Sequence, residues 1–180
     1  MGKTTTSAAP VFEFLDAAHR EIQVQLVALR DLALAIVDDR FGPAEQLQAK
    51  AVLAHFNGAA RDHHLDEEKH IFPALLRSHS PDLVQATEQL VQDHGWLEAM
   101  WLQIEPSLDA ARHGNTWFDP SEMLQAVEVF QQLYHEHIEL EESIAYPQAR
   151  KLVAPGDALT MGREMAKRRV VAQTAASAGA

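Results

Sequence analysis

Residues 63–73, HHLDEEKHIFP, and residues 137–147, HIELEESIAYP, are two copies of one pattern, HxxxEExxx[FY]P. In an α-helix, positions i and i+4 lie one above the other on the same face. The histidine and the first glutamate of each copy therefore point in one direction from their helix. The two pairs defined in this way are His63 with Glu67 and His137 with Glu141.

Each pair interrupts a face that is otherwise apolar. At about 100° per residue, Phe56 and Ala60 share the face of the first pair, and Phe130 and Ile144 share the face of the second. A single HxxxE pair is more often solvated on an exposed face, and that alternative stays open for one copy alone. Two copies on apolar faces favour a buried site, because buried polar groups need partners and metal ions satisfy both imidazoles and carboxylates.

The surrounding sequence predicts an all-α fold. Apolar residues recur at helical spacing almost to the end of the chain, without a convincing strand pattern. Gly, Pro, Ser and Asn residues interrupt that spacing at three places, which predicts four long helices in an up-down-up-down bundle. We expect these helices over residues 11–39, 43–78, 81–112 and 120–151.

Four parts of the chain follow from this division. We expect a disordered leader over residues 1–10, the four-helix bundle over 11–151, a short C-terminal helical extension over 152–169, and a disordered tail over 170–180. Ser80 is expected to cap the third helix. Pro73 and Pro147 are expected to loosen the final turns of the second and fourth helices.

Two further histidines lie on apolar faces, His19 on the first helix and His94 on the third. At about 1.5 Å of rise per residue, His19 and His63 each lie roughly 30 Å from the turn that joins their helices. His94 and His137 lie roughly 27 and 24 Å from the turn between the third and fourth helices. An up-down-up-down bundle therefore brings all four histidines to about one layer.

This combination resembles the hemerythrin-like (HHE cation-binding) proteins of the bacterial non-haem di-iron type. The resemblance covers roughly residues 11–150, and residues 159–169 resemble a segment found after such domains. It implies two iron ions in an Fe-O-Fe centre, with both glutamates bridging. The implied ligands are His19, His63, Glu67, His94, His137 and Glu141.

The chain departs from the oxygen-carrying members at two positions, where Glu98 and Glu142 stand in place of a histidine and an aspartate. The pattern is closer to the di-iron proteins of iron-sulfur cluster repair and nitrosative stress, although their cysteine-bearing extension is absent. With Glu98 in place of a fifth histidine, we expect a centre that is more open or more anionic. That difference predicts rapid autoxidation and no efficient reversible O2 carriage.

The remaining histidines have less support. His64 and His135 are expected to be solvated, because they lie off the inferred inner face. His70 makes an ExxH spacing with Glu67 that is used by ferritin-like carboxylate sites, but the fourth helix has no second copy. Whether His70, Glu98 or Glu142 contacts metal directly stays open. His55, His79 and His113 have no supporting pattern.

Composition excludes several classes of partner. The chain has 180 residues, with 26 acidic against 15 basic residues and a formal net charge of -11, so binding to nucleic acid or anionic lipid is disfavoured. It has no cysteine, so any metal site must use histidine and carboxylate. No apolar stretch approaches the roughly 20 residues of a membrane span and no signal peptide is apparent, which predicts a cytoplasmic protein.

Three functions fit these residues. We expect a di-iron protein that binds O2, NO or peroxide as part of oxygen or nitrosative stress handling or iron-centre repair. A di-iron oxidase or peroxidase is the enzymatic alternative, which turnover with peroxide and a reductant would reveal. A helical interaction module with a regulatory metal site is the third. The sequence does not choose an electron donor, a pathway or an oligomeric state.

Overall fold

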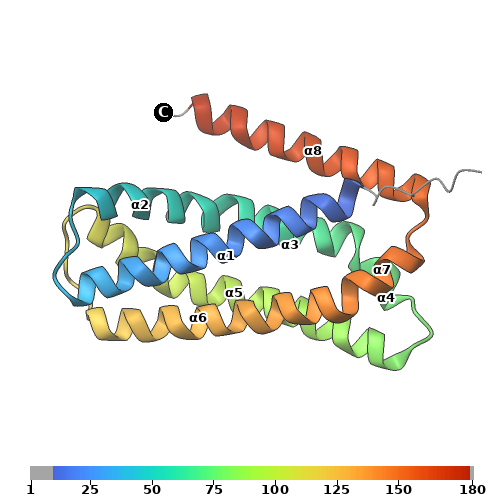
Figure 1. Cartoon of the computed structure of the whole chain (residues 1–180), viewed down its shortest axis with the longest axis horizontal. Coiled ribbons are helices and arrows are strands. Elements are labelled where there is room, and N and C mark those ends of the chain that lie inside the picture. Colours follow the sequence, from blue (N-terminus) through green and yellow to red (C-terminus); the bar gives the residue numbers. More distant parts are fainter. Residues whose placement is uncertain (1–9, 179–180) are drawn as a thin grey trace, which may run out of the picture.

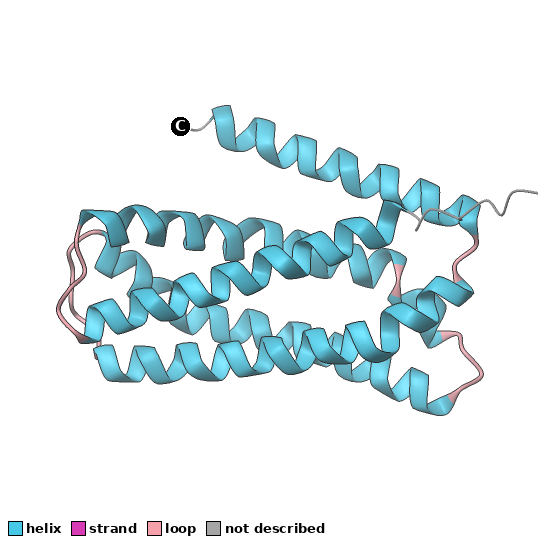
Figure 2. Ribbon diagram, viewed as in Figure 1, coloured by secondary structure: helices cyan, strands magenta, loops and turns pink. Residues whose placement is uncertain are grey.

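The computed structural model describes the backbone of residues 10–178 and the side chains of residues 11–169. Four helical rods run alternately up and down as a bundle, and a fifth helix lies along its outside (Figures 1 and 2). The backbone from residue 10 to 178 contains no strand. The prediction of an all-α, up-down-up-down four-helix bundle is confirmed.

The first and third rods are single helices, whereas the second and fourth are built from consecutive segments. In chain order the segments are α1 (Pro10–Val37), α2 (Pro43–Ala54), a π-helical turn (His55–Ala59), α3 (Ala60–His70), α4 (Phe72–Leu76), α5 (Pro81–Arg112), α6 (Pro120–Leu140), a second π-helical turn (Glu141–Ala145), α7 (Tyr146–Leu152) and α8 (Pro155–Ala178).

A proline occupies the first position of α2, α5, α6 and α8. Its fixed φ suits a first helical turn, where the missing N–H would have no partner inside the helix. Before α6, the side chain of Asp119 accepts hydrogen bonds from the backbone N–H groups of Ser121 and Glu122. Ser80 precedes α5, but its side chain makes no such bond. The cap predicted at Ser80 is therefore a backbone cap only.

One irregular turn in the second rod and one in the fourth come just before prolines. α3 and α4 meet at Ile71, two residues before Pro73, and the π-helical turn Glu141–Ala145 ends two residues before Pro147. A proline has no N–H to donate to the carbonyl four residues earlier, so the regular helix is interrupted there. The structure shows the loosening expected at both prolines. α5 nevertheless continues through Pro106.

The apolar core is divided into two clusters along the bundle axis. The larger cluster contains Ile22, Phe56, Leu97 and Phe130, and it lies towards the turns that join α1 to α2 and α5 to α6. The smaller cluster lies towards the other end of the bundle, where α4, α7 and α8 meet. Buried histidine and carboxylate side chains occupy the layer between the clusters. The fold therefore places a polar layer in the middle of its own core.

α8 closes the smaller cluster from outside. Ala158 and Met165 are buried there, against α1 and the end of the bundle. Near the C-terminal end of the described side chains, Arg168 and Arg169 reach the buried carboxylate of Asp66 on α3, at 2.9 and 3.1 Å. The segment that was expected as a C-terminal helical extension therefore contributes to the core and to the ion pairs of a buried aspartate.

α8 is also longer than predicted. The sequence predicts a short helix that ends at Arg169 and a disordered tail from residue 170, but the backbone stays helical to Ala178. The tail is rich in alanine, and its small residues were interpreted as disorder although alanine has the highest helix propensity. The leader expected over residues 1–10 lies outside the described residues except for Pro10, as do residues 179–180.

The packing of α8 can be tested with two substitutions in that helix. Met165→Ala removes a side chain that is 0% exposed, so we expect it to lower the free energy of unfolding by about 2–5 kcal/mol. Leu159→Ala is the control, because Leu159 is 49% exposed and its loss should cost no more than about 0.5 kcal/mol. Urea denaturation measures both values. Equal effects of the two substitutions would show that α8 does not pack as described.

Candidate metal centre

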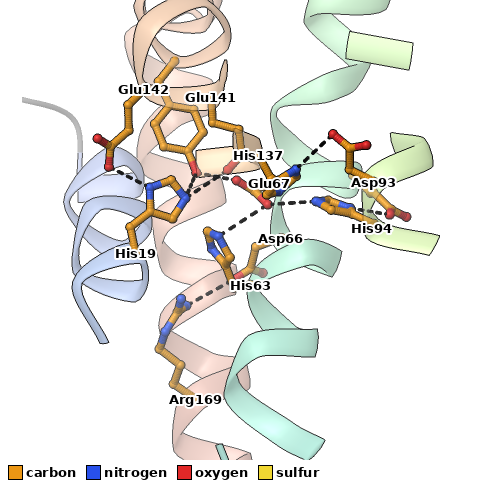
Figure 3. Close-up of polar contacts among 12 residues, drawn as sticks. His19, His63, Asp66, Glu67, Asp93, His94, His137, Glu141, Glu142 and Arg169 are labelled. Carbon is orange, nitrogen blue, oxygen red and sulfur yellow. Dashed lines mark hydrogen bonds and ion pairs between the residues drawn. The ribbon is translucent and has the colours of Figure 1, made fainter. Parts of the chain in front are cut away.

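The six side chains predicted as ligands converge in the polar layer between the two apolar clusters (Figure 3). They come from all four rods, and each is at most 5% exposed. The residues are His19 on α1, His63 and Glu67 on α3, His94 on α5, His137 on α6, and Glu141 at the start of the second π-helical turn.

Each of the two central glutamates faces one histidine of its own rod and one of a neighbouring rod. Oε2 of Glu67 lies 3.5 Å from Nε2 of His63 and 3.4 Å from Nε2 of His94. The oxygens of Glu141 lie 3.4 Å from Nε2 of His137 and 3.0 Å from Nε2 of His19. Each carboxylate therefore lies between two histidine pairs, His19 with His63 on one side and His94 with His137 on the other.

This arrangement makes two donor groups that overlap. One group consists of His19 and His63 with both glutamates, and the other of His94 and His137 with the same glutamates. Within each group the potential ligand atoms all lie within 4.8 Å of one another. A carboxylate has two oxygens, so each glutamate can serve an ion in both groups. The geometry thus suits two neighbouring cations rather than one.

The hydrogen bonding of the centre fits cations as well. Buried nitrogen and oxygen atoms without a hydrogen-bond partner gather here, which is unusual in a folded protein. They include Nε2 of His63, His94 and His137, Oε2 of Glu67 and both side-chain oxygens of Glu141. Lone pairs on these atoms would be satisfied by coordination to divalent first-row metals, which favour imidazole and carboxylate.

The second glutamate of each sequence copy orients a histidine of the neighbouring rod. Nδ1 of His19 donates a hydrogen bond to Glu142 at 2.9 Å, and Nδ1 of His94 donates one to Glu68 at 2.8 Å. These bonds fix the tautomer that leaves Nε2 free to face the centre, as is common around metal-bound histidines. The repeated EE of the pattern is the signal from which this role could have been predicted.

Tyr146 is a further residue of the centre that the sequence reasoning missed. Its buried hydroxyl donates a hydrogen bond to Oε1 of Glu67 and lies 3.0 Å from Nε2 of His19. The equivalent residue of the first copy, Phe72, stacks on His94 in the same way as Tyr146 stacks on His19. The copies are therefore alike in packing, and only one brings a hydroxyl. The tyrosine at the [FY] position of the second copy is the feature of the sequence from which this hydroxyl could have been predicted.

The prediction for His64 is wrong. It was expected to be solvated, but its ring lies 4.0 Å from that of His94 and 5.7 Å from that of His137, between centroids. His64 is three residues before Glu67, so it is only about 60° from Glu67 around the helix. The inner face of α3 is wide enough to include both. His135, by contrast, is exposed as predicted.

Three residues whose role was left open lie outside the cluster of potential ligand atoms. Glu98 is exposed and forms an ion pair with Arg61, so it adds no anionic ligand to the centre as placed. His70 is buried but faces Glu164 of α8, with 3.7 Å between Nε2 and the carboxylate. Glu142 reaches the centre through His19 alone. The more anionic centre expected from Glu98 therefore has no geometric support.

Burial controls the protonation of the metal-free centre. It lowers the pKa of His63 to about 3, and it lowers the pKa of His64 and His137 as well. Burial, together with the negative charge of Glu67, raises the pKa of Glu141 well above its usual range. Burial therefore favours the neutral form of these three imidazoles, which is the form that binds metal. The pKa of His94 is raised instead, because its hydrogen bonds and charge interactions with Glu67 and Glu68 outweigh the effect of burial.

Comparison with known proteins identifies one family and one similar sequence. The model of the family described as Hemerythrin HHE cation binding domain matches residues 11–149. An uncharacterized protein of Haemophilus influenzae (strain ATCC 51907 / DSM 11121 / KW20 / Rd) is 28% identical over 163 residues, which cover 88% of this chain and 90% of that protein. The family match spans all four rods and every residue of the centre.

None of the helices between residues 10 and 178 is long and apolar enough to cross a membrane.

The metal-free protein should become less stable as the pH falls from about 6.5 to 4.5. Burial makes His63, His64 and His137 harder to protonate in the folded chain than in the unfolded chain, which takes up these protons below about pH 6.5, so acid favours unfolding. Glu141 acts in the opposite direction, because its raised pKa lets the folded chain keep a proton that the unfolded chain loses above about pH 4.5. The raised pKa of His94 acts in the same direction as that of Glu141. The three imidazoles with lowered pKa values outnumber these two groups.

Urea denaturation at several pH values, after removal of metal with a chelator, measures this dependence. His63→Gln should reduce the slope of unfolding free energy against pH, by at most about 1.4 kcal/mol per pH unit. His135→Gln should leave it unchanged, because His135 is exposed. A slope that is the same in the wild type and the His63→Gln variant would contradict the burial of a neutral imidazole.

Proposed function

This chain belongs to the hemerythrin HHE cation-binding family, and from that premise we propose that it is a non-haem di-iron protein that binds or reacts with O2, NO or peroxide. The observation that carries the proposal is the sharing of Glu67 and Glu141 between two groups of histidines. A single cation could not use both groups at once, whereas two cations can share the carboxylates, whose charges offset those of the metals.

The donor set supports iron. It contains imidazole nitrogens and carboxylate oxygens, without thiolates, and such sets in helix bundles commonly hold di-iron centres. Reduced iron with an open coordination position supplies the electrons and the binding site that O2, NO or peroxide require. We take the ligands to be His19, His63, Glu67, His94, His137 and Glu141.

The chain itself contributes orientation, a proton and exclusion of water. Glu68 and Glu142 hold two imidazoles with Nε2 towards the centre. Tyr146 holds its hydroxyl proton against Glu67, beside His19, where it can hydrogen-bond a small ligand next to that histidine. The two apolar clusters cover the centre from both ends of the bundle, which keeps bulk water away from it.

A surface cleft ends against the side chains that close this side of the centre. It has a volume of about 440 Å³ and lies where α1 and α7 meet, with His19, Glu142 and Tyr146 in its wall. Diatomic molecules and peroxide are much smaller than this volume. We therefore place the entry of small ligands at the His19 side, where the Tyr146 hydroxyl lies, rather than at the side of Phe72.

Metal content gives the first test. After anaerobic loading with Fe²⁺ and removal of unbound iron, we expect elemental analysis to find about two irons per chain, one for each donor group. Glu67→Ala and Glu141→Ala should each abolish the two-iron site, since each removes a ligand of both ions. Glu139→Ala is the matched control, because Glu139 is exposed on the same rod. A wild-type value of one iron, or tight zinc binding without iron uptake, would contradict the assignment.

Reactivity gives the second test. The reduced, iron-loaded protein should form an NO adduct and should react with O2, because the centre combines reduced iron with a cleft that admits small molecules. Stopped-flow absorption spectroscopy follows both reactions, with the zinc-loaded protein as the unreactive control. Sustained turnover of peroxide with a reductant would assign the enzymatic alternative. A fully loaded protein that changes with none of O2, NO or peroxide would refute the proposed function.

A further inference from the structure

His64 carries a buried imidazole nitrogen, Nε2, that forms no hydrogen bond with any described residue. This atom is inaccessible to solvent. It joins His94 and His137 in a third group of potential ligand atoms, all within 4.8 Å of one another. The corresponding residue of the second sequence copy is Ile138, so the repeat does not require a histidine here. Its presence on this side alone makes the two halves of the centre different.

Packing does not explain His64 by itself. The His64 ring stacks on His94, with centroids 4.0 Å apart and planes at 13°, but an apolar ring would stack there without leaving a buried nitrogen unpaired, which is costly. A cavity of about 10 Å³ lies beside the ring, lined also by Glu98 and Tyr134, so its outer side is not tightly filled. This volume, about that of a single water probe, leaves room for a small displacement of the ring.

Resting on the proposed di-iron function, we propose that His64 supplies a third imidazole to the ion held by His94 and His137. Two imidazoles on one ion have nitrogens about 3–4 Å apart when each metal–nitrogen distance is about 2.1 Å. The ligand atoms of this group lie at most 4.8 Å apart, so a shift of at most about 2 Å brings them to that spacing. The ion at His94 then has three histidines and the ion at His19 has two.

This assignment changes the number of open positions. His64 fills a position on one ion that the other four histidines leave empty, so exogenous ligands are directed to the other ion. That ion lies on the side of the cleft and of the Tyr146 hydroxyl. In the oxygen-carrying members the additional histidine stands at the sequence position of Glu98, on α5. In this chain the additional imidazole comes from α3 instead.

Proton NMR of the Co²⁺-loaded protein tests this assignment. A histidine bound to Co²⁺ through Nε2 keeps an exchangeable Nδ1–H, whose resonance is shifted far outside the diamagnetic range. We expect one such resonance for each of His19, His63, His94 and His137 and a fifth for His64. His64→Phe keeps a ring that can stack on His94 and should lose one resonance. His135→Phe, at an exposed position of α6, should keep all five.

Four resonances in the wild type, or five in His64→Phe, would overturn the assignment of His64 while leaving the two-metal centre in place. Loss of all shifted imidazole resonances, or a pattern for one ion only, would instead reject the proposed function together with this inference. If His64→Phe fails to fold, His64→Gln replaces it, and the wild-type count of five or four decides the question by itself.

Discussion

The cost of burying imidazoles and carboxylates together is the constraint on which this bundle depends. Four histidines and two glutamates, each at most 5% exposed, form a layer that separates two apolar clusters. Removing such groups from water is unfavourable unless they gain partners. Their mutual contacts are incomplete, because most of the inward nitrogens and oxygens lack a hydrogen bond. Divalent cations would supply the missing interactions, so we expect metal binding to stabilise the folded chain.

The internal repeat explains how a short pattern builds a centre with two sides. In each copy the histidine and the first glutamate face inward from one rod, and the second glutamate holds a histidine of the neighbouring rod. Two copies on two rods therefore position four histidines. Two of the differences between the copies lie at the centre, where the second copy has Tyr146 in place of Phe72 and Ile138 in place of His64. Those differences give each side its own chemistry: a hydroxyl and a cleft on one side, and an additional imidazole on the other.

Helical periodicity predicted the four rods, and the heights of the histidines along them predicted that the four histidines would lie in about one layer. Those inferences succeed because the rise and rotation of a helix are fixed, so spacing in sequence becomes position in space. His64 was misplaced because a face was treated as a narrow stripe, whereas a residue about 60° from Glu67 still points towards a centre surrounded by four rods. The partnership of Glu142 with His19 joins residues 123 positions apart, which no local pattern encodes. The length of α8 was underestimated because alanine-rich sequence occurs in both helices and disordered tails.

The central claim is that Glu67 and Glu141 each stand between two metal ions. Anomalous X-ray diffraction from iron-loaded crystals, recorded at the iron absorption edge, tests it most directly. The account predicts two anomalous peaks about 3–4 Å apart, one beside His19 and His63 and the other beside His94 and His137, with both glutamates between them. A single peak, or two peaks that do not share these carboxylates, would contradict it.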